Sequence, residues 1–214
     1  MPMLNCDRMK IVIVGPAGSG KGTQSELISK KYRVPQISMG DLLRDFAKGG
    51  SKKAKETKKL LEKGILVPDE LTVRLIRKRI KKEDCRKGFI LDGWPRNMNQ
   101  VRLAKFLKID HVIYLDVRTS ELIKRLSSRW SCPKCKAVYG SAKREKRKGL
   151  CDKCGSVLFQ REDDKPAAIR ERLKVFRKYT RPMIAYYKKQ GVLRRINGNR
   201  PPEEILGDIE KALG

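Results

Sequence analysis

Short runs of apolar residues alternate with segments of helical periodicity along most of the chain. The run Lys10–Val14 is apolar and β-branched and ends at a glycine-rich turn, which predicts a buried parallel strand followed by a helix over Lys21–Tyr32. Further strands are expected at Phe89–Leu91, Val112–Val117 and Val192–Ile196, with helical segments between them. This alternation predicts an α/β fold with a parallel sheet flanked by helices.

Two stretches interrupt the alternation and predict insertions into a core domain. Residues 38–67 carry short helical patterns broken at Gly49–Gly50 and at Gly64. Residues 130–164 are poor in apolar residues and rich in Cys, Gly and Lys. The core is then expected to consist of residues 1–37, 68–129 and 165–214.

The first predicted strand leads into a glycine-rich sequence, Gly15-Pro-Ala-Gly-Ser-Gly-Lys-Gly-Thr23. A strand before it and a helix after it are the context of a phosphate-binding loop, whose backbone N–H groups point at one anion. Lys21 would reach the terminal phosphates, and the helix N-terminus adds partial positive charge. Gly22 replaces the Ser or Thr that usually binds magnesium, which leaves Thr23 to contact phosphate. The alternative is a glycine-rich turn without a ligand.

A second motif lies at the end of a predicted strand, in Phe89-Ile-Leu-Asp-Gly-Trp-Pro-Arg96. An apolar strand followed by Asp92 places a carboxylate at the carboxyl edge of the sheet, where ligands bind in such folds. Alternatively, Asp92 caps the next turn and Arg96 pairs with it.

Four of the six cysteines follow the pattern C-x₂-C-x₁₅-C-x₂-C, as Cys132, Cys135, Cys151 and Cys154. This spacing predicts one tetrahedral Zn²⁺ held by four thiolates. The site would be structural, because no ligand position is left open, and it would fold a segment that has few apolar side chains. Two disulfides are the alternative, which a cytosolic chain disfavours, and the same ligands would also accept iron.

The composition excludes some functional classes. The 214 residues are 39% hydrophobic and 36% charged, which is typical of a globular domain with a small insertion. No apolar run is long enough to cross a bilayer and residues 1–8 lack a signal-peptide core, so we expect a cytoplasmic protein. The single histidine, His111, excludes a multi-histidine metal site and is expected at the surface or at a sheet edge. Cys6 and Cys85 are expected to be unpaired thiols without a role.

Taken together, these motifs resemble the adenylate kinase family and its nucleoside monophosphate kinase relatives. The spelling Gly-Lys-Gly-Thr-Gln over residues 20–24 is similar to the family's phosphate loop, and matching segments follow in order to Gly214. They include Ile37–Arg44, Gly64–Glu70 and Phe89–Arg96. The resemblance implies a P-loop NTPase-like core, a helical nucleoside monophosphate-binding insertion at residues 38–67 and a zinc-ribbon-like lid at residues 130–164. It also implies reversible phosphoryl transfer from Mg-ATP to AMP, giving two ADP, by a monomeric enzyme.

The resemblance further implies three groups of site residues, in addition to the four zinc-binding cysteines. The catalytic group consists of Lys21, Asp92, Arg96, Arg129, Arg161 and Arg172. The ATP-binding group consists of Gly18, Ser19, Gly20, Lys21, Gly22, Thr23, Arg125, Arg129, Val138, Tyr139 and Arg200. The AMP-binding group consists of Met39, Arg44, Ile65, Leu66, Val67, Gly93, Trp94, Pro95, Arg96, Gln100, Arg161 and Arg172.

Some positions bear on specificity and on closure of the lid. Gln100 matches the family position that reads adenine by hydrogen bonds, whereas Met39 stands where AMP-using members have Thr. Asn197 stands where the family usually has Asp in the loop that passes the donor adenine. Asp163 and Asp164 match carboxylates that contact arginines when the lid closes, and a competing interpretation is that they cap the next helix. An acceptor of CMP, UMP or GMP is the alternative within the family.

The charge supports an alternative from another class. Fifty-two Lys and Arg against 24 Asp and Glu leave a net charge of +28, which favours nucleic acid, acidic membrane or phosphorylated metabolites as partners. A zinc-ribbon protein that binds nucleic acid would use the basic segment Lys143–Lys148, but it leaves the phosphate loop unexplained. That segment alternatively forms a solvated loop tip, and a thermophile would carry the same charge without such a partner. We expect nucleotides as partners, with no membrane and no specific nucleic acid.

Overall fold

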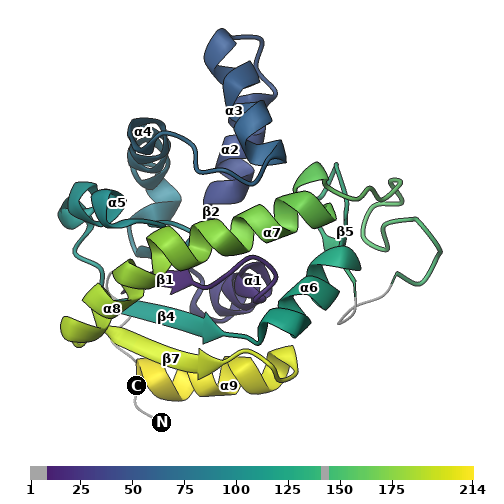
Figure 1. The fold of residues 1–214 in the computed structure, drawn as a ribbon. Coiled ribbons are helices and arrows are strands. Elements are labelled where there is room, and N and C mark those ends of the chain that lie inside the picture. Colours follow the sequence, from purple (N-terminus) through teal and green to yellow (C-terminus); the bar gives the residue numbers. More distant parts are fainter. Residues whose placement is uncertain (1–8, 141–144) are drawn as a thin grey trace.

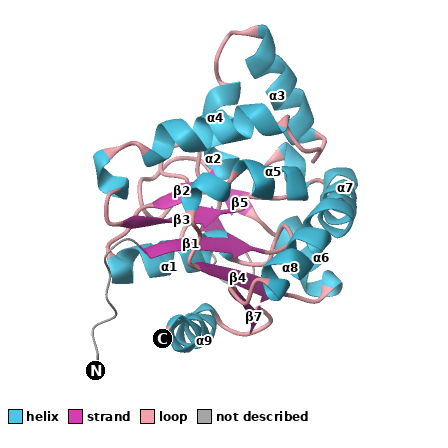
Figure 2. Cartoon of the chain, turned by 90° about the vertical axis from the view of Figure 1, so that its left-hand side faces the viewer, coloured by secondary structure: helices cyan, strands magenta, loops and turns pink. Residues whose placement is uncertain are grey.

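A computed structural model describes residues 9–140 and 145–214. Its centre is a five-stranded parallel sheet in the order β2-β3-β1-β4-β7 (Figures 1 and 2). The strands are β1 (Met9–Val14), β2 (Gln36–Ser38), β3 (Gly88–Asp92), β4 (His111–Asp116) and β7 (Leu193–Asn197). The four strands predicted from apolar runs are therefore confirmed, and the three-residue β2 was missed because its one buried residue, Ile37, makes no apolar run.

Helices cover both faces of the sheet, as expected (Figure 2). The principal ones are α1 (Lys21–Tyr32), α2 (Met39–Ala47), α3 (Lys52–Glu62), α4 (Asp69–Ile80), α5 (Met98–Leu103), α6 (Thr119–Ser127), α7 (Pro166–Val175), α8 (Arg181–Lys189) and α9 (Pro202–Leu213). Short 3₁₀ turns lie at η1 (Glu83–Cys85), η2 (Lys105–Leu107) and η3 (Glu162–Asp164). A π-helical turn, η4 (Phe176–Thr180), joins α7 to α8.

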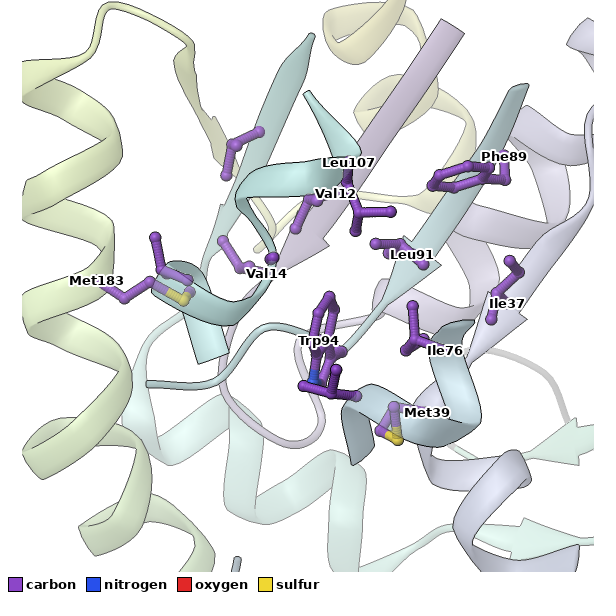
Figure 3. Close-up of a cluster of buried hydrophobic side chains, with 14 of the residues drawn as sticks. Val12, Val14, Ile37, Met39, Ile76, Phe89, Leu91, Trp94, Leu107 and Met183 are labelled. Atoms are coloured by element: carbon purple, nitrogen blue, oxygen red, sulfur yellow. The ribbon is translucent and has the colours of Figure 1, made fainter. Parts of the chain in front are cut away.

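The apolar core is divided by the sheet into two layers. Ile11 and Ile13 of β1 face α1 and α9, where they pack with residues such as Ile28 and Ile209. Val12 and Val14 face the opposite side, in the cluster shown in Figure 3 with Trp94, Met39, Ile76 and Met183. Because successive strand residues point to opposite faces, a strand covered on both sides is apolar throughout. That is why the run of β1 is continuous and carries no alternation.

The residues of the first insertion form the helices α2 and α3, with α3 projecting from the body of the molecule (Figure 1). Each helix begins at a serine: the Oγ of Ser38 accepts from the N–H of Asp41 at 3.3 Å, and the Oγ of Ser51 accepts from the N–H of Ala54 at 3.2 Å. The break predicted at Gly49–Gly50 is confirmed.

Residues 130–164, called the lid below, contain little regular structure. An antiparallel pair joins β5 (Trp130–Ser131) to β6 (Val138–Tyr139). The buried cluster of this segment consists of Cys132, Tyr139, Cys151 and Leu158, so half of its members are cysteines. This agrees with the expectation that burial alone supports the segment poorly. Of the basic segment Lys143–Lys148, Lys143 and Arg144 lie outside the described residues, as does Cys6.

One position was placed wrongly by sequence. His111 begins β4, which lies between β1 and β7, so it is partly buried in an inner strand rather than at the surface or a sheet edge. Burial lowers its pKa. Among residues 9–140 and 145–214, no helix is both long and apolar enough to cross a membrane.

Candidate active site

The glycine-rich loop connects the carboxyl end of β1 to the N-terminus of α1. Gly18 has φ of +81°, and a Cβ there would lie 2.9 Å from Cγ of Leu126, so the loop needs glycine to pack against α6. Gly20 caps α1 in the left-handed conformation and offers no side chain to the first turn. Since the first N–H groups of a helix have no intrahelical acceptor, those of α1 are available to an anion.

Lys21 lies beneath this loop and is partly buried, with its side chain lining the pocket described below. Its Nζ donates to the carbonyl oxygen of Pro16 at 2.8 Å. Burial lowers the pKa of Lys21 to about 7. The charge of Asp92 acts to raise this pKa, whereas the charges of Arg96 and Arg172 lower it further. A phosphate group beside Lys21 would restore the charged ammonium form, because an opposite charge favours ionisation.

Asp92 ends β3 opposite the first turn of α1. Its Oδ2 accepts from Nε2 of Gln36 at 3.1 Å, and a Cβ on Gly22 would lie 3.5 Å from the same oxygen. Burial raises the pKa of Asp92, against the nearby charge of Lys21. The alternative pairing with Arg96 is wrong, because the described residues contain no ion pair between them and Nε of Arg96 donates to the carbonyl of Gly93 at 2.6 Å.

Five arginines from separate segments lie close enough to repel one another: Arg44 in α2, Arg96 after β3, Arg129 after α6, Arg161 before η3 and Arg172 in α7. Burial, and then repulsion from Arg172, lowers the pKa of Arg96 to about 10. Burial, and then the charges of Arg44 and Arg129, lowers the pKa of Arg161 to about 10. Nε of Arg161 is buried without a hydrogen-bond partner. Such a cluster suits polyanionic phosphate groups.

Two carboxylates offset part of this charge. Asp164 pairs with Arg129, whose Nε donates to Oδ2 at 2.7 Å. Nη1 of Arg172 lies 2.9 Å from Oδ2 of Asp163 and 3.1 Å from Oδ1 of Asp164. The expected contacts with arginines are thus present. The capping interpretation is wrong, because α7 begins after Lys165 without a side-chain cap, although Pro166 does occupy its first turn.

A single pocket connects the phosphate loop to the first insertion. Lys21 lines it together with Leu66, Gly93, Pro95, Arg96 and Arg172, which were expected on the acceptor side. Val175, Phe176 and Thr180 also line it and were missed by sequence analysis. Val175 ends α7, and Phe176 and Thr180 belong to the π-helical turn. No sequence motif predicts that turn. π-Helical turns occur frequently at functional sites.

Other expected site residues lie outside this lining. The side chains of Met39, Val67 and Trp94 are buried in the core, and Nε1 of Trp94 donates to Oγ1 of Thr72 at 3.0 Å. These three can therefore meet a nucleotide through backbone atoms only, unless the core moves. The Tyr139 hydroxyl lies 3.4 Å from Sγ of Cys151 and accepts from the N–H of Asp152 at 2.9 Å.

Four more of the expected site residues, three from the donor side and Ile65 from the acceptor side, also lie outside the pocket lining. Arg125 pairs through Nε with Glu121 at 2.8 Å and donates through Nη1 to the carbonyl of Gly198 at 3.0 Å. Arg200 pairs with Asp208 of α9. Val138 and Ile65 are 46% and 41% exposed and so remain available for contact with a base.

The four lid cysteines come together as predicted. All four Sγ atoms lie within 4.8 Å of one another, and thiolates bound to one zinc ion at about 2.3 Å would stand about 3.8 Å apart. The shortest separations are 3.4 Å, from Cys132 to Cys154 and from Cys135 to Cys151, which excludes disulfides between these atoms. The cluster is compatible with a structural zinc ion.

The two cysteine pairs share one backbone geometry. In the first, the N–H of Lys136 donates to Cys132 O at 3.1 Å; in the second, the N–H of Gly155 donates to Cys151 O at 2.8 Å. Lys136 and Gly155 have φ of +61° and +72°, the left-handed region that each turn requires. Two matching turns thus present the thiolates to a common centre.

Comparison with known proteins agrees with this architecture. The family described as adenylate kinase matches residues 13–192. Among similar proteins, an adenylate kinase of Caldanaerobacter subterraneus subsp. tengcongensis is 44% identical over 212 residues, which is 96% of each chain. Adenylate kinases of Methanocella arvoryzae and Archaeoglobus fulgidus are 44% and 42% identical, over 96% of this chain and 98% of theirs. Together with the phosphate loop, the arginine cluster and the parallel sheet, these matches establish that the chain belongs to the adenylate kinase family.

Proposed function

We propose that the cleft transfers the terminal phosphoryl group of Mg-ATP to AMP and returns two molecules of ADP. The observation that carries this proposal is one pocket that is lined by Lys21 of the phosphate loop together with Arg96, Arg172 and Leu66. Donor phosphates and an acceptor phosphate can therefore meet there. This is the reaction named by the family to which the chain belongs.

On the donor side, the first turn of α1 supplies backbone N–H groups to the phosphates and Lys21 supplies a charge. Asp92 suits a water-bound Mg²⁺, because its carboxylate faces this turn and residue 22 offers no hydroxyl. When bound, the ion neutralises charge on the donor phosphates. We place ATP against the loop residues Gly18–Thr23, with Arg125, Val138, Tyr139 and Arg200 nearer the base.

During transfer, negative charge spreads over the equatorial oxygens of the moving group. The arginine cluster is suited to stabilise that charge with planar guanidinium groups, and Asp163 and Asp164 hold Arg129 and Arg172 in place beforehand. We assign Arg44 and Arg161 to the acceptor phosphate. An oxygen of that phosphate attacks the transferring phosphorus, so no covalent enzyme intermediate is needed.

The four lid cysteines are proposed to hold one structural zinc ion. Their thiolates form a closed donor set, and Cys132 and Cys151 make up half of the buried apolar cluster of the lid. The cytoplasmic location, the monomeric state and the domain boundaries expected from sequence stay predictions.

Lys21→Ala tests the proposal. Loss of Lys21 removes the cation that the phosphate loop presents to the pocket. ADP formation from Mg-ATP and AMP should therefore fall at least a thousandfold, because comparable charges in phosphotransferases contribute roughly 10³–10⁵ in rate. The matched control is Lys30→Ala, at an exposed position of the same helix. Both variants should keep the circular-dichroism spectrum of the unmodified protein. Retained activity in Lys21→Ala would refute the assigned phosphate site.

A further inference from the structure

Asp69 begins α4 directly after the segment that leads out of the first insertion. Three side-chain amides donate to its carboxylate: Nε2 of Gln100 at 2.7 Å and Nδ2 of Asn97 at 2.9 Å to Oδ1, and Nδ2 of Asn99 at 2.8 Å to Oδ2. The donors belong to the start of α5 and lie 28 to 31 residues away in sequence. The Asp69 carboxylate therefore links the start of α4 to the start of α5 by hydrogen bonds.

The amide of Gln100 is held from both ends. Its Oε1 accepts from the backbone N–H of Arg96 at 2.7 Å, while its Nε2 donates to Asp69. A backbone N–H can only donate and a carboxylate can only accept, so the orientation of this amide follows from its two neighbours. Gln100 is 1% exposed, which leaves little room for it to rotate.

The fixed orientation has a chemical consequence for the acceptor base. A side-chain amide has two N–H donors and two acceptor lone pairs, so Gln100 retains one of each after both contacts. Adenine presents an amino donor beside a ring-nitrogen acceptor, whereas guanine presents a carbonyl acceptor beside an N–H donor. An amide free to turn over can match either base, but one that is locked can match only one.

We propose that Asp69 is a positioning residue for acceptor specificity: it locks the Gln100 amide in the orientation that matches adenine and opposes guanine. The inference rests on the proposed function, with AMP as acceptor, and on the contact with its base that the family resemblance implies for Gln100. Asp69 acts through Gln100 and touches neither the phosphates nor the transferring group. Asp69 follows Val67 by two residues and is linked through Gln100 to the backbone of Arg96, another residue expected at the acceptor site.

The test is the selectivity ratio, kcat/KM with AMP divided by kcat/KM with GMP. Asp69→Asn keeps the size of the side chain but places an N–H group beside its amide neighbours. The ratio should fall about tenfold, the effect of one hydrogen bond of about 1.4 kcal/mol, mainly through a higher KM for AMP, while the KM for ATP stays unchanged. Asp69→Ala, which offers no acceptor at all, should lower the ratio at least as far.

Glu70→Gln is the matched control, because Glu70 is an exposed carboxylate in the same helical turn. It removes the same charge from the N-terminus of α4 and should leave the ratio unchanged. A purely structural role for Asp69 would lower the melting temperature and affect AMP and GMP equally. An unaltered ratio in both Asp69 variants would overturn the proposal.

Gln100→Ala, alone and combined with Asp69→Asn, completes a double-mutant cycle. Because Asp69 acts through Gln100, adding Asp69→Asn to Gln100→Ala should produce no further loss of selectivity. Additive losses would contradict that route. If Gln100→Ala alone leaves the ratio unchanged, the proposed reading of the base by Gln100 fails, and the role of Asp69 fails with it.

Discussion

Arg161 shows how the site is arranged at the scale of single residues. Its guanidinium is largely buried, and burial together with Arg44 and Arg129 lowers its pKa to about 10. Its Nε has no hydrogen-bond partner. Asp163 and Asp164 offset the lowering of this pKa only in part. A buried cation that is only partly compensated weakens the folded state, and a bound phosphate would remove that penalty. Arg161 is therefore suited to bind a phosphate ligand, but it destabilises the ligand-free protein.

Arg161→Met tests whether the Arg161 cation destabilises the ligand-free protein while it supports AMP binding. A long apolar side chain in place of the cation should raise the melting temperature of the nucleotide-free protein by a few degrees, corresponding to about 1 kcal/mol. ADP formation should fall at least tenfold through a higher KM for AMP. Differential scanning calorimetry and steady-state kinetics measure the two effects.

Arg170→Met is the control, because Arg170 is exposed on α7 and forms no ion pair within the described residues. It should change neither quantity. A lower melting temperature for Arg161→Met would show that Arg161 stabilises the ligand-free protein, and this would contradict a destabilising effect of its burial.

Residue types were easier to predict from sequence than their contacts. The phosphate loop and the cysteine pairs are local patterns, so their spacing alone identified them. The contacts of Asp69 with α5 escaped notice because they join residues about 30 positions apart. The buried state of Met39 and Trp94 also depends on distant packing that no local pattern records.

At the scale of elements, strand predictions succeeded where both faces of the strand are apolar, as in β1. The helix Lys21–Tyr32 was predicted with the bounds that α1 has, because the glycine-rich turn marks its start, although its buried residues include the polar Gln24 and Ser25. The π-helical turn between α7 and α8 was missed, since a helix that takes one extra residue per turn keeps its helical composition. The lid differs from both, because its turns are organised around cysteines.

Cys151→Ser tests the lid as an element. Sγ of Cys151 is buried beside Sγ of Cys135 and the Tyr139 hydroxyl, so its loss should disrupt the four-thiolate set. We expect about one equivalent of bound zinc in the unmodified protein and much less in the variant, with a lower melting temperature. Metal analysis and calorimetry provide the measurements.

Cys85→Ser is the control, because the Cys85 thiol lies outside the lid, in the apolar cluster that contains residues of α4. It should retain the full zinc content. Because the sheet and its two apolar layers do not include the lid, Cys151→Ser should keep the far-ultraviolet circular-dichroism signal of the core. Equal zinc content in Cys151→Ser and unmodified protein would refute the metal assignment.

At the scale of the whole molecule, the lid contacts both the insertion and the core through exposed ion pairs. Lys136 pairs with Asp45 of α2 at 2.7 Å, and Lys153 approaches Glu26 of α1 at 3.4 Å. Exposed pairs of this kind contribute roughly 0–1 kcal/mol each. These two exposed contacts are therefore weak enough to break at each turnover, whereas the pairs of Asp163 and Asp164 with Arg129 and Arg172 are largely buried.

The overall positive charge fits a protein whose substrates are nucleotides. The net charge is +28, and the cationic side chains that converge on one pocket are the ones best suited to phosphates. The charge raises the local concentration of anionic nucleotides around the protein. The family assignment does not favour the nucleic-acid alternative.

Mg-ATP and AMP are the proposed substrates of this cleft. The most direct measurement is a coupled assay for nucleoside diphosphate, with purified protein, Mg-ATP and AMP, CMP, UMP or GMP in separate reactions. We predict rapid ADP formation with AMP and slow turnover with the other three. A faster reaction with another acceptor would contradict the assignment of AMP, and no product with any acceptor would contradict phosphoryl transfer itself.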